Sequence, residues 1–228
     1  MSNCELLIFD WDGTLADSIG RIVQAMHQAA DACDLPRLDD AAVKGIIGLA
    51  LPEAIAHLYP QLTGAASIEV FRQRYSEQYL ALEHQPSPLF PGVVELLAKF
   101  REQGLLLAVA TGKSRRGLDR VLAAHRWEDY FDITRCADET ASKPDPLMLD
   151  EILAHCGKRS DQAVMIGDSI FDLQMAQRAG MDAIAVSYGA QAPEVLALHS
   201  PQRMINRFEE LSGWLAARNA SEVECYVG

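Results

Sequence analysis

Two aspartates, Asp10 and Asp12, directly follow the apolar run LLIF at positions 6–9, and Gly13 and Thr14 come next. A tight turn with solvated carboxylates would account for this pattern by itself, since aspartate and glycine are common in turns. Two carboxylates two positions apart can also act as a nucleophile and as a general acid–base. The ends of the other apolar segments decide between these two interpretations.

Polar residues also follow later segments of the chain. Thr111 and Gly112 close the run LLLAVA, Asp168 closes AVMIG, and Lys143 precedes a proline before a helical pattern. Asp172 lies four residues after Asp168. If the strands are parallel, their carboxyl ends lie at one edge of the sheet. We therefore expect these side chains to meet the first two aspartates at that edge.

Such a gathering of charged groups has a definite chemistry. Several carboxylates a few ångströms apart repel one another unless a cation lies among them. Hard oxygen ligands, without histidine or cysteine at ligand spacing, favour Mg²⁺ over zinc. A lysine, a threonine hydroxyl and backbone N–H groups beside the metal would bind a phosphoryl dianion. The set as a whole is what phosphoryl transfer requires.

The elements that position these residues alternate along much of the chain. Continuous apolar runs bounded by turns indicate strands buried on both faces, at 6–10, 105–112, 133–138, 163–168 and 184–189. Helical patterns lie between them, at 93–100, 145–156 and 171–180. Alternation of strand and helix predicts an α/β fold with a doubly wound parallel sheet.

Residues 16–84 interrupt this alternation with four helical segments and no convincing strand. The prolines Pro86, Pro88 and Pro91 then mark the return to the alternating pattern. The sequence therefore predicts an inserted all-helical cap domain at 16–85, and a core domain formed by 1–15 and 86–228. Because the insertion begins four residues after Asp12, we expect the cap to stand above the site.

Four motifs carry a resemblance to a known family. They are Asp10-Trp11-Asp12-Gly13-Thr14, Thr111, Lys143 and Gly167-Asp168-Ser169-Ile170-Phe171-Asp172. In this order they resemble the motifs of the haloacid dehalogenase superfamily, and the chain is most similar to its phosphoglycolate-phosphatase-like group with a helical cap. Trp11 departs from the small or aliphatic residue usual there. We interpret it as a packing residue, because that side chain is not a ligand in the family.

The resemblance implies a role for each motif residue. Asp10 is expected to attack phosphorus and form an aspartyl-phosphate, and Asp12 to protonate the leaving alcohol and then deprotonate water. Mg²⁺ is expected to be held by Asp10, Asp12 through its backbone carbonyl, and Asp168, with Asp172 ligating or orienting. The phosphoryl oxygens are expected to be held by Thr111, the amide of Gly112 and Lys143.

The resemblance also implies an activity, namely a Mg²⁺-dependent phosphatase acting on a small phosphorylated metabolite, with 2-phosphoglycolate as the leading candidate. A sugar-phosphate mutase similar to β-phosphoglucomutase stays open, as does a pyrophosphatase or nucleotidase of the same family. A phospho-accepting signalling domain is the alternative from another class. Such a domain needs neither a second acid at Asp12 nor a large insertion, so both features argue against it.

Bulk composition narrows the partners and the location. The net charge is −12, from 20 Lys+Arg against 32 Asp+Glu, so the chain would repel the backbone of a nucleic acid. The longest apolar run is too short to cross a membrane, and no signal peptide is apparent. Five cysteines with no CxxC pair indicate reduced thiols, which predicts a cytoplasmic protein.

Other polar residues near the motifs have more modest interpretations. Asp17 and Ser18 are expected to cap the first helix of the cap. A nucleotide-binding P-loop at Gly112-Lys113-Ser114 is excluded, because Leu107 stands where that motif needs a glycine. A solvated surface position is the more typical interpretation, and contact with the variable part of a substrate is the alternative, for Lys44, Gly45, Gly48, Lys113 and Arg115.

Overall fold

The structure is a computed structural model that describes residues 3–220, so the tail 221–228 and with it Cys225 lie outside the described residues. Its centre is a parallel sheet in the order β3-β2-β1-β4-β5-β6. The strands are β1 (Leu6–Phe9), β2 (Leu106–Thr111), β3 (Ile133–Cys136), β4 (Ala163–Gly167), β5 (Asp182–Val186) and β6 (Arg203–Ile205).

Strand β1 lies between β2 and β4, where the direction of winding changes. Phe9 pairs with Val109 of β2 on one side and with Ile166 of β4 on the other. Asp10 continues this register, because its amide donates to the Ile166 carbonyl at 2.9 Å. Open α/β sheets bind ligands at such a switch point, outside the carboxyl ends of the strands.

Helices cover both faces of the sheet, which is why the central strands β1 and β4 are apolar throughout. Leu7 and Phe9 of β1 pack on one face and Leu6 and Ile8 on the other. The first face is covered by α5 (Val93–Glu102), α6 (Arg115–His125) and α10 (Glu210–Ala220). The second is covered by α7 (Leu147–Cys156), α8 (Ile170–Arg178) and α9 (Pro193–Ala197). A short 3-10 helix, η1 (Ser160–Gln162), precedes β4.

Trp11 is buried on the first face, as its packing interpretation requires. Its side chain is 1% exposed, and its ring meets Trp127 edge-on at 6.3 Å between centroids. The predicted strands and helices of the core are all present. Strand β6 and helices α6, α9 and α10 were missed, and β6 has only three residues, too few for a period to be recognised.

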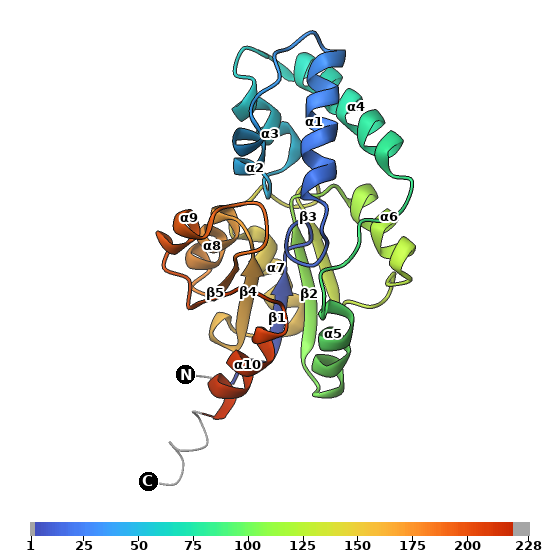
Figure 1. Ribbon diagram of the computed structural model, residues 1–228. Helices are drawn as coiled ribbons and strands as arrows, with labels where there is room; N and C mark the ends of the chain where they lie inside the picture. Colours follow the sequence, from blue (N-terminus) through green and yellow to red (C-terminus); the bar gives the residue numbers. More distant parts are fainter. Residues whose placement is uncertain (1–2, 221–228) are drawn as a thin grey trace.

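Four helices between β1 and α5 form a separate layer at the carboxyl end of the sheet (Figure 1). They are α1 (Ile19–Ala32), α2 (Asp40–Gly45), α3 (Leu51–Leu58) and α4 (Ala65–Leu82), and we call them the cap. Met26 and Ala29 of α1 and Phe71 of α4 belong to a hydrophobic core of the cap itself. The cap therefore has its own source of stability and lies over the predicted site.

The cysteines within residues 3–220 form no disulfide. Cys4, Cys33, Cys136 and Cys156 are free, and Cys4 and Cys136 are buried. Within residues 3–220, no helix combines the length and the apolar character that crossing a membrane demands.

Candidate active site

The carboxyl ends of the central strands bring the predicted residues together. Asp10 follows β1, Thr111 ends β2, and Asp168 follows β4. Lys143 comes from the loop before α7, and Asp172 from the first turn of α8. All five are at most 1% exposed. Their convergence follows directly from the parallel order of three neighbouring strands.

Lys143 lies between two carboxylates. Its Nζ donates to Oδ1 of Asp10 and to Oδ1 of Asp172, each at 2.7 Å. Burial works against the ammonium charge, but the two aspartates outweigh burial and raise the pKa of Lys143 above its ordinary value. The lysine is therefore a fixed positive charge that orients the Asp10 carboxylate.

The carboxylates exceed this single positive charge. One oxygen each of Asp10, Asp168 and Asp172 lies within 4.8 Å of the other two. Burial, only partly offset by Lys143, raises the pKa of Asp10 to about 7. Burial, with Asp10 and Asp172 adding to it, also raises the pKa of Asp168 well above its ordinary value. These buried hard oxygens with excess negative charge form a donor set that fits Mg²⁺.

Asp168 is held in place by its neighbours in the chain fold. Its Oδ1 accepts the Thr14 hydroxyl at 3.1 Å, and its Oδ2 accepts the Ala190 amide at 2.7 Å. A Cβ added at Gly13, where φ is +83°, would lie 2.2 Å from Oδ2, and one at Gly189 would lie 2.2 Å from the Asp168 Cβ. Glycine at both positions is what lets the backbone approach this carboxylate.

Asp172 serves two purposes in the structure. Its Oδ2 accepts the Ser169 amide at 3.1 Å, and its own amide donates to the Ser169 hydroxyl at 3.3 Å, so the two residues form a capping box at the start of α8. The Ser169 hydroxyl also donates to Oδ2 at 2.7 Å. The Oδ1 of Asp172 accepts from Lys143. The capping box at the start of α8 thus holds Asp172 in place, and Asp172 in turn holds Lys143.

Asp12 lies on the cavity side of the cluster and has partners at both oxygens. Its Oδ2 is 3.0 Å from Nζ of Lys113, and its Oδ1 accepts the Ser18 hydroxyl. The predicted cap of α1 is therefore wrong. Ser18 stands at the N-cap position but makes no side-chain capping bond, because its hydroxyl turns to Asp12 instead. Asp17 makes no capping bond to α1 in the described chain either.

Lys113, for which the sequence favoured a solvated surface position over a substrate contact, lines the cavity beside Asp12. It lies two residues beyond Thr111, and its Nζ contacts Asp12 and stands 5.3 Å from the centre of the Tyr79 ring in the cap. Asp12 and Tyr79 outweigh burial and raise the pKa of Lys113. The only signal in the sequence was its proximity to the strand end.

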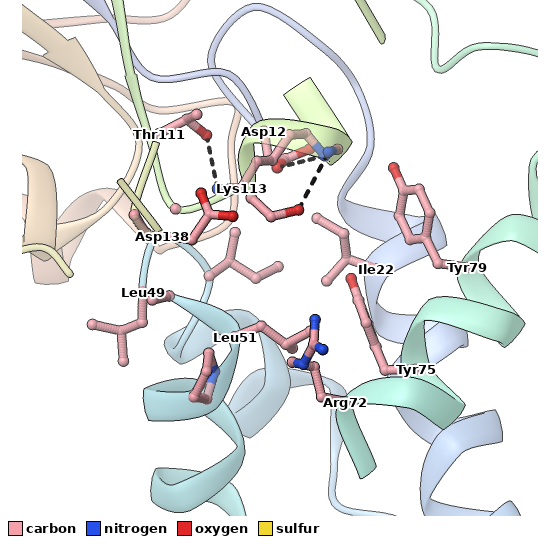
Figure 2. Close-up of a pocket in the computed structure, with 18 of the residues that line it drawn as sticks. Asp12, Ile22, Leu49, Leu51, Arg72, Tyr75, Tyr79, Thr111, Lys113 and Asp138 are labelled. Carbon is pink, nitrogen blue, oxygen red and sulfur yellow. Dashed lines mark hydrogen bonds and ion pairs between the residues drawn. The ribbon is translucent and has the colours of Figure 1, made fainter. Parts of the chain in front are cut away.

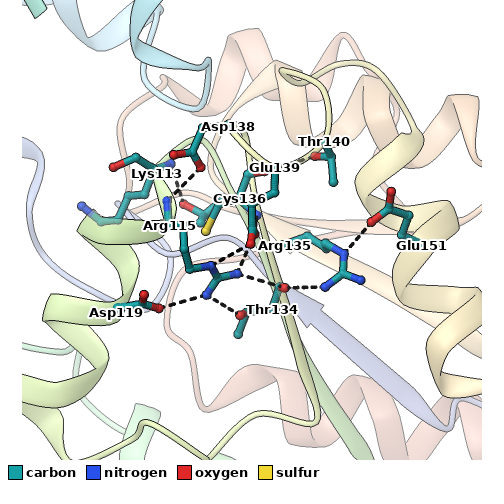
Figure 3. Close-up of polar contacts among 12 residues, drawn as sticks. Lys113, Arg115, Asp119, Thr134, Arg135, Cys136, Asp138, Glu139, Thr140 and Glu151 are labelled. Atoms are coloured by element: carbon teal, nitrogen blue, oxygen red, sulfur yellow. Dashed lines mark hydrogen bonds and ion pairs between the residues drawn. The ribbon is translucent and has the colours of Figure 1, made fainter.

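Arg115, two residues further on, is fixed in a polar network of the core (Figure 3). Its guanidinium makes two bonds to Glu139, at 2.7 and 3.0 Å, and others to Asp119 and Thr134. Arg115 and Lys44 are both absent from the lining of the main cavity, so neither reaches a substrate there in this structure.

A cavity of about 560 Å³ separates the sheet edge from the cap (Figure 2). Asp10, Asp12, Thr111 and Gly112 line its floor. The loop between α2 and α3 lies directly on that floor: a Cβ at Gly112 would be 2.6 Å from the carbonyl oxygens of the cap residues Gly48 and Leu49.

Two hydrogen bonds also join the cap to the core. The Ala50 amide donates to the Ser142 hydroxyl at 2.9 Å, and the side chain of Gln191 donates to the Gly45 carbonyl at 3.1 Å. Asp10, Asp12, Thr111 and Gly112 therefore line one side of a space between the core and the cap, whereas Lys143, Asp168 and Asp172 are not among its lining residues.

Known proteins are similar to this chain in sequence and in architecture. The probable phosphatase IndB of Dickeya dadantii is 35% identical over 213 residues, 91% of this chain and 92% of that protein. The phosphoglycolate phosphatase of Pectobacterium atrosepticum is 31% identical over 210 residues, 90% and 89% of the two chains. A hydrolase structure from Pseudomonas syringae matches the fold with a TM-score of 0.85 and 24% identity, over 95% of this chain and 99% of the other.

The sequence model of the haloacid dehalogenase-like hydrolases matches residues 7–186. This span includes the five buried residues that meet at the carboxyl ends of the strands, namely Asp10, Thr111, Lys143, Asp168 and Asp172. The expected fold, a doubly wound α/β core with helices inserted after the first strand, is confirmed by the sheet order and by the solved neighbour. By sequence and by structure, the chain belongs to the haloacid dehalogenase-like hydrolase family.

Proposed function

We propose that the protein is a Mg²⁺-dependent phosphatase that hydrolyses a phosphomonoester through an aspartyl-phosphate on Asp10. The observation that carries this proposal is the buried Asp10, oriented by Lys143 at 2.7 Å, on the floor of the cavity beside Asp168. The phosphatase names of the relatives support it. Because several relatives are named phosphoglycolate phosphatase, 2-phosphoglycolate is the first substrate to test.

Asp10 is the nucleophile in this proposal. Its carboxylate oxygen forms a bond to phosphorus while the bond from phosphorus to the alcohol oxygen breaks. Lys143 keeps the Asp10 carboxylate in one orientation, so that a bound phosphoryl group meets the nucleophilic oxygen in a reactive geometry. The Thr111 hydroxyl and the Gly112 amide, at the adjacent strand end, donate to the phosphoryl oxygens.

Asp12 moves the proton. It gives a proton to the departing alcohol, and in the second half of the reaction it takes one from the water that attacks the aspartyl-phosphate. Ser18 and Lys113 hold its two oxygens and so fix where the proton is given and taken. Asp12 is thereby returned to its starting state after each turnover.

Asp10, Asp168 and the backbone carbonyl of Asp12 would hold the Mg²⁺ ion, with Asp172 close enough to contribute an oxygen. When bound, the ion supplies positive charge that offsets both the carboxylates and the phosphoryl group. Thr14 and the Ala190 amide keep Asp168 oriented for this purpose.

The decisive variant is Asp10→Asn, assayed by release of inorganic phosphate from an aryl phosphate and from 2-phosphoglycolate. We expect a loss of about 10⁴-fold or more in kcat, since a group that forms the covalent intermediate is removed. Asp17→Asn, which changes an exposed aspartate nearby, is the matched control and should retain activity. Activity retained by Asp10→Asn would remove this residue from the nucleophile's role.

The same assay separates the alternatives. A phosphatase releases many phosphates per chain, a phospho-accepting domain about one, and a sugar-phosphate mutase forms the isomer without accumulating phosphate. Inorganic pyrophosphate and nucleoside monophosphates belong in the substrate panel, so that a pyrophosphatase or nucleotidase is recognised by its preference.

A further inference from the structure

The cavity above the phosphoryl site is much larger than a two-carbon substrate. Its volume is about 560 Å³. The glycolate part of 2-phosphoglycolate displaces roughly three or four waters, about 100 Å³ at about 30 Å³ each. Cavities of about 300–1,000 Å³ enclose ligands of drug size. A small acid would leave most of this space unfilled.

The walls of the cavity are mainly apolar and include two aromatic rings. Tyr75 and Tyr79 of α4 have ring centres 5.9 Å apart and lie side by side, and we call them the aromatic wall (Figure 2). Most of the other apolar lining residues come from α1, from the segment that joins α2 to α3 and from the start of α3, and they include Ile22, Met26, Ile47, Leu49 and Leu51. Such walls favour a flat, largely apolar group.

The two tyrosine hydroxyls are unused by the protein. Within residues 3–220, neither the Tyr75 nor the Tyr79 hydroxyl has a hydrogen-bond partner, although Tyr79 is only 6% exposed. Burial raises the pKa of Tyr75 well above its ordinary value, so this hydroxyl stays neutral. Neutral donors with free capacity can serve a ligand's polar atoms, but they cannot balance a carboxylate charge.

The positive charges around the cavity are mostly committed to acids of the protein. Among the lining residues, three of the four lysines and arginines have an acidic partner. The pairs are Lys113–Asp12 at 3.0 Å, Arg72–Glu69 at 2.6 Å and Arg120–Glu83 at 2.9 Å. The fourth, Arg116, is exposed at the rim. Apart from the exposed Arg116, a carboxylate in the cavity would therefore have to compete with these acids for a counter-ion, which makes its burial costly.

Resting on the phosphatase chemistry above, we propose that the natural substrate class is a phosphomonoester whose organic group is an uncharged flat ring, held between the aromatic wall and Leu49 and Leu51. Size, apolar lining and the commitment of the cations all favour this class over 2-phosphoglycolate. Tyr75 and Tyr79 are its specificity-determining residues.

The test compares alkyl phosphates with closely similar leaving groups: 2-phosphoglycolate, methyl phosphate, benzyl phosphate and 4-carboxybenzyl phosphate. We expect kcat/KM for benzyl phosphate to exceed that for 2-phosphoglycolate by about tenfold or more, because burial of a ring contributes to transition-state binding. The added carboxylate should lower kcat/KM about tenfold. Equal or better turnover of 2-phosphoglycolate would overturn the proposal.

Variants of the aromatic wall provide an independent measurement. Tyr75→Leu should lower the ratio of kcat/KM for benzyl phosphate over methyl phosphate about three- to tenfold, and Tyr75→Phe should restore most of it. Glu77→Gln, an exposed change on the same helix, is the control and should leave the ratio as in the wild type. A ratio that Tyr75→Leu does not change would contradict the role of the wall.

Failure of the phosphatase proposal would look different, since no phosphate ester would then be hydrolysed at all. In that event, calorimetric binding of benzylphosphonate and methylphosphonate with Mg²⁺ present still tests the cavity. We expect the benzyl compound to bind at least about tenfold more tightly. Equal affinities would overturn the ring proposal whatever the chemistry.

Discussion

The floor and the cap side of the cavity are built in opposite ways. On the floor, buried charged groups hold one another, as Lys143 holds Asp10 and Asp172 at 2.7 Å. On the cap side, the aromatic wall presents ring faces and hydroxyls for which residues 3–220 provide no hydrogen-bond partner. The floor is thus preorganised for a phosphoryl group, which every phosphomonoester has, whereas the wall selects among the groups attached to it.

After Asp10→Asn, Lys143→Met should have the largest effect, because the floor depends on its buried charge. We expect kcat to fall about 10³-fold or more, and the free energy of unfolding to fall by about 3–5 kcal/mol, since two buried carboxylates lose their partner. Urea unfolding and phosphate release measure both. Lys99→Met, at an exposed lysine, is the control. Near-normal activity of Lys143→Met would show that the floor does not need this charge.

Removal of divalent metal should make the free energy of unfolding depend on pH through the carboxylates of the floor. In the folded protein the pKa of Asp10 is about 7, above its unfolded value, so between about pH 4 and 7 the folded state binds more protons. In EDTA, stability should therefore fall as pH rises through that window, by roughly 2–4 kcal/mol at about 1.4 kcal/mol per pKa unit. Urea unfolding at several pH values measures this.

Mg²⁺ should restore stability near pH 7, because it compensates the ionised carboxylates. Asp10→Asn serves as the comparison and should show a smaller slope in EDTA. If the metal-free protein instead became more stable as pH rises from about 4 to 7, that result would contradict the excess of negative charge assigned to the floor.

Gly13→Ala should weaken Mg²⁺ activation about 10- to 100-fold, because the new Cβ would lie 2.2 Å from Oδ2 of Asp168. The Mg²⁺ dependence of the initial rate gives the effect. Gly104→Ala is a closely matched control, since φ is +82° at Gly104 and +83° at Gly13, but nothing lies within 4 Å of its Cβ. Equal effects of the two variants would mean that backbone strain alone is responsible.

Ser18→Ala should have the smallest effect, a fall of about three- to tenfold in kcat, since Asp12 loses one hydrogen bond. Because Ser18 does not cap α1, hydrogen exchange in the first turn of α1 should stay as in the wild type. Asp39→Ala, which removes the true cap of α2, should accelerate exchange there. Faster exchange at the start of α1 in Ser18→Ala would restore the capping interpretation.

The sequence was sufficient for the sheet and for most of the floor. Strands buried on both faces are continuous apolar runs, and parallel pairing then places their last residues at one edge of the sheet. The proximity of Asp10, Thr111 and Asp168 could therefore be predicted from the sequence. The sequence was insufficient for β6, whose three residues carry no period. It also misassigned Ser18, because a serine before a helix looks the same whether it bonds to the helix or to a distant carboxylate.

Local patterning by itself determined the core helices α5, α7 and α8, the strands other than β6, the inserted helical segment and the order of the acidic motifs, because each depends on residues close in the chain. The tertiary structure decided which charges are free, since partners such as Arg120 of the core and Glu83 at the end of α4 are brought together only by folding. It also decided the size of the cavity and brought the aromatic wall into the same cavity as Asp12. The pairing of charges, the cavity size and the place of the aromatic wall all depend on distances between residues far apart in the sequence, and the spacing of residues along the chain does not specify these distances.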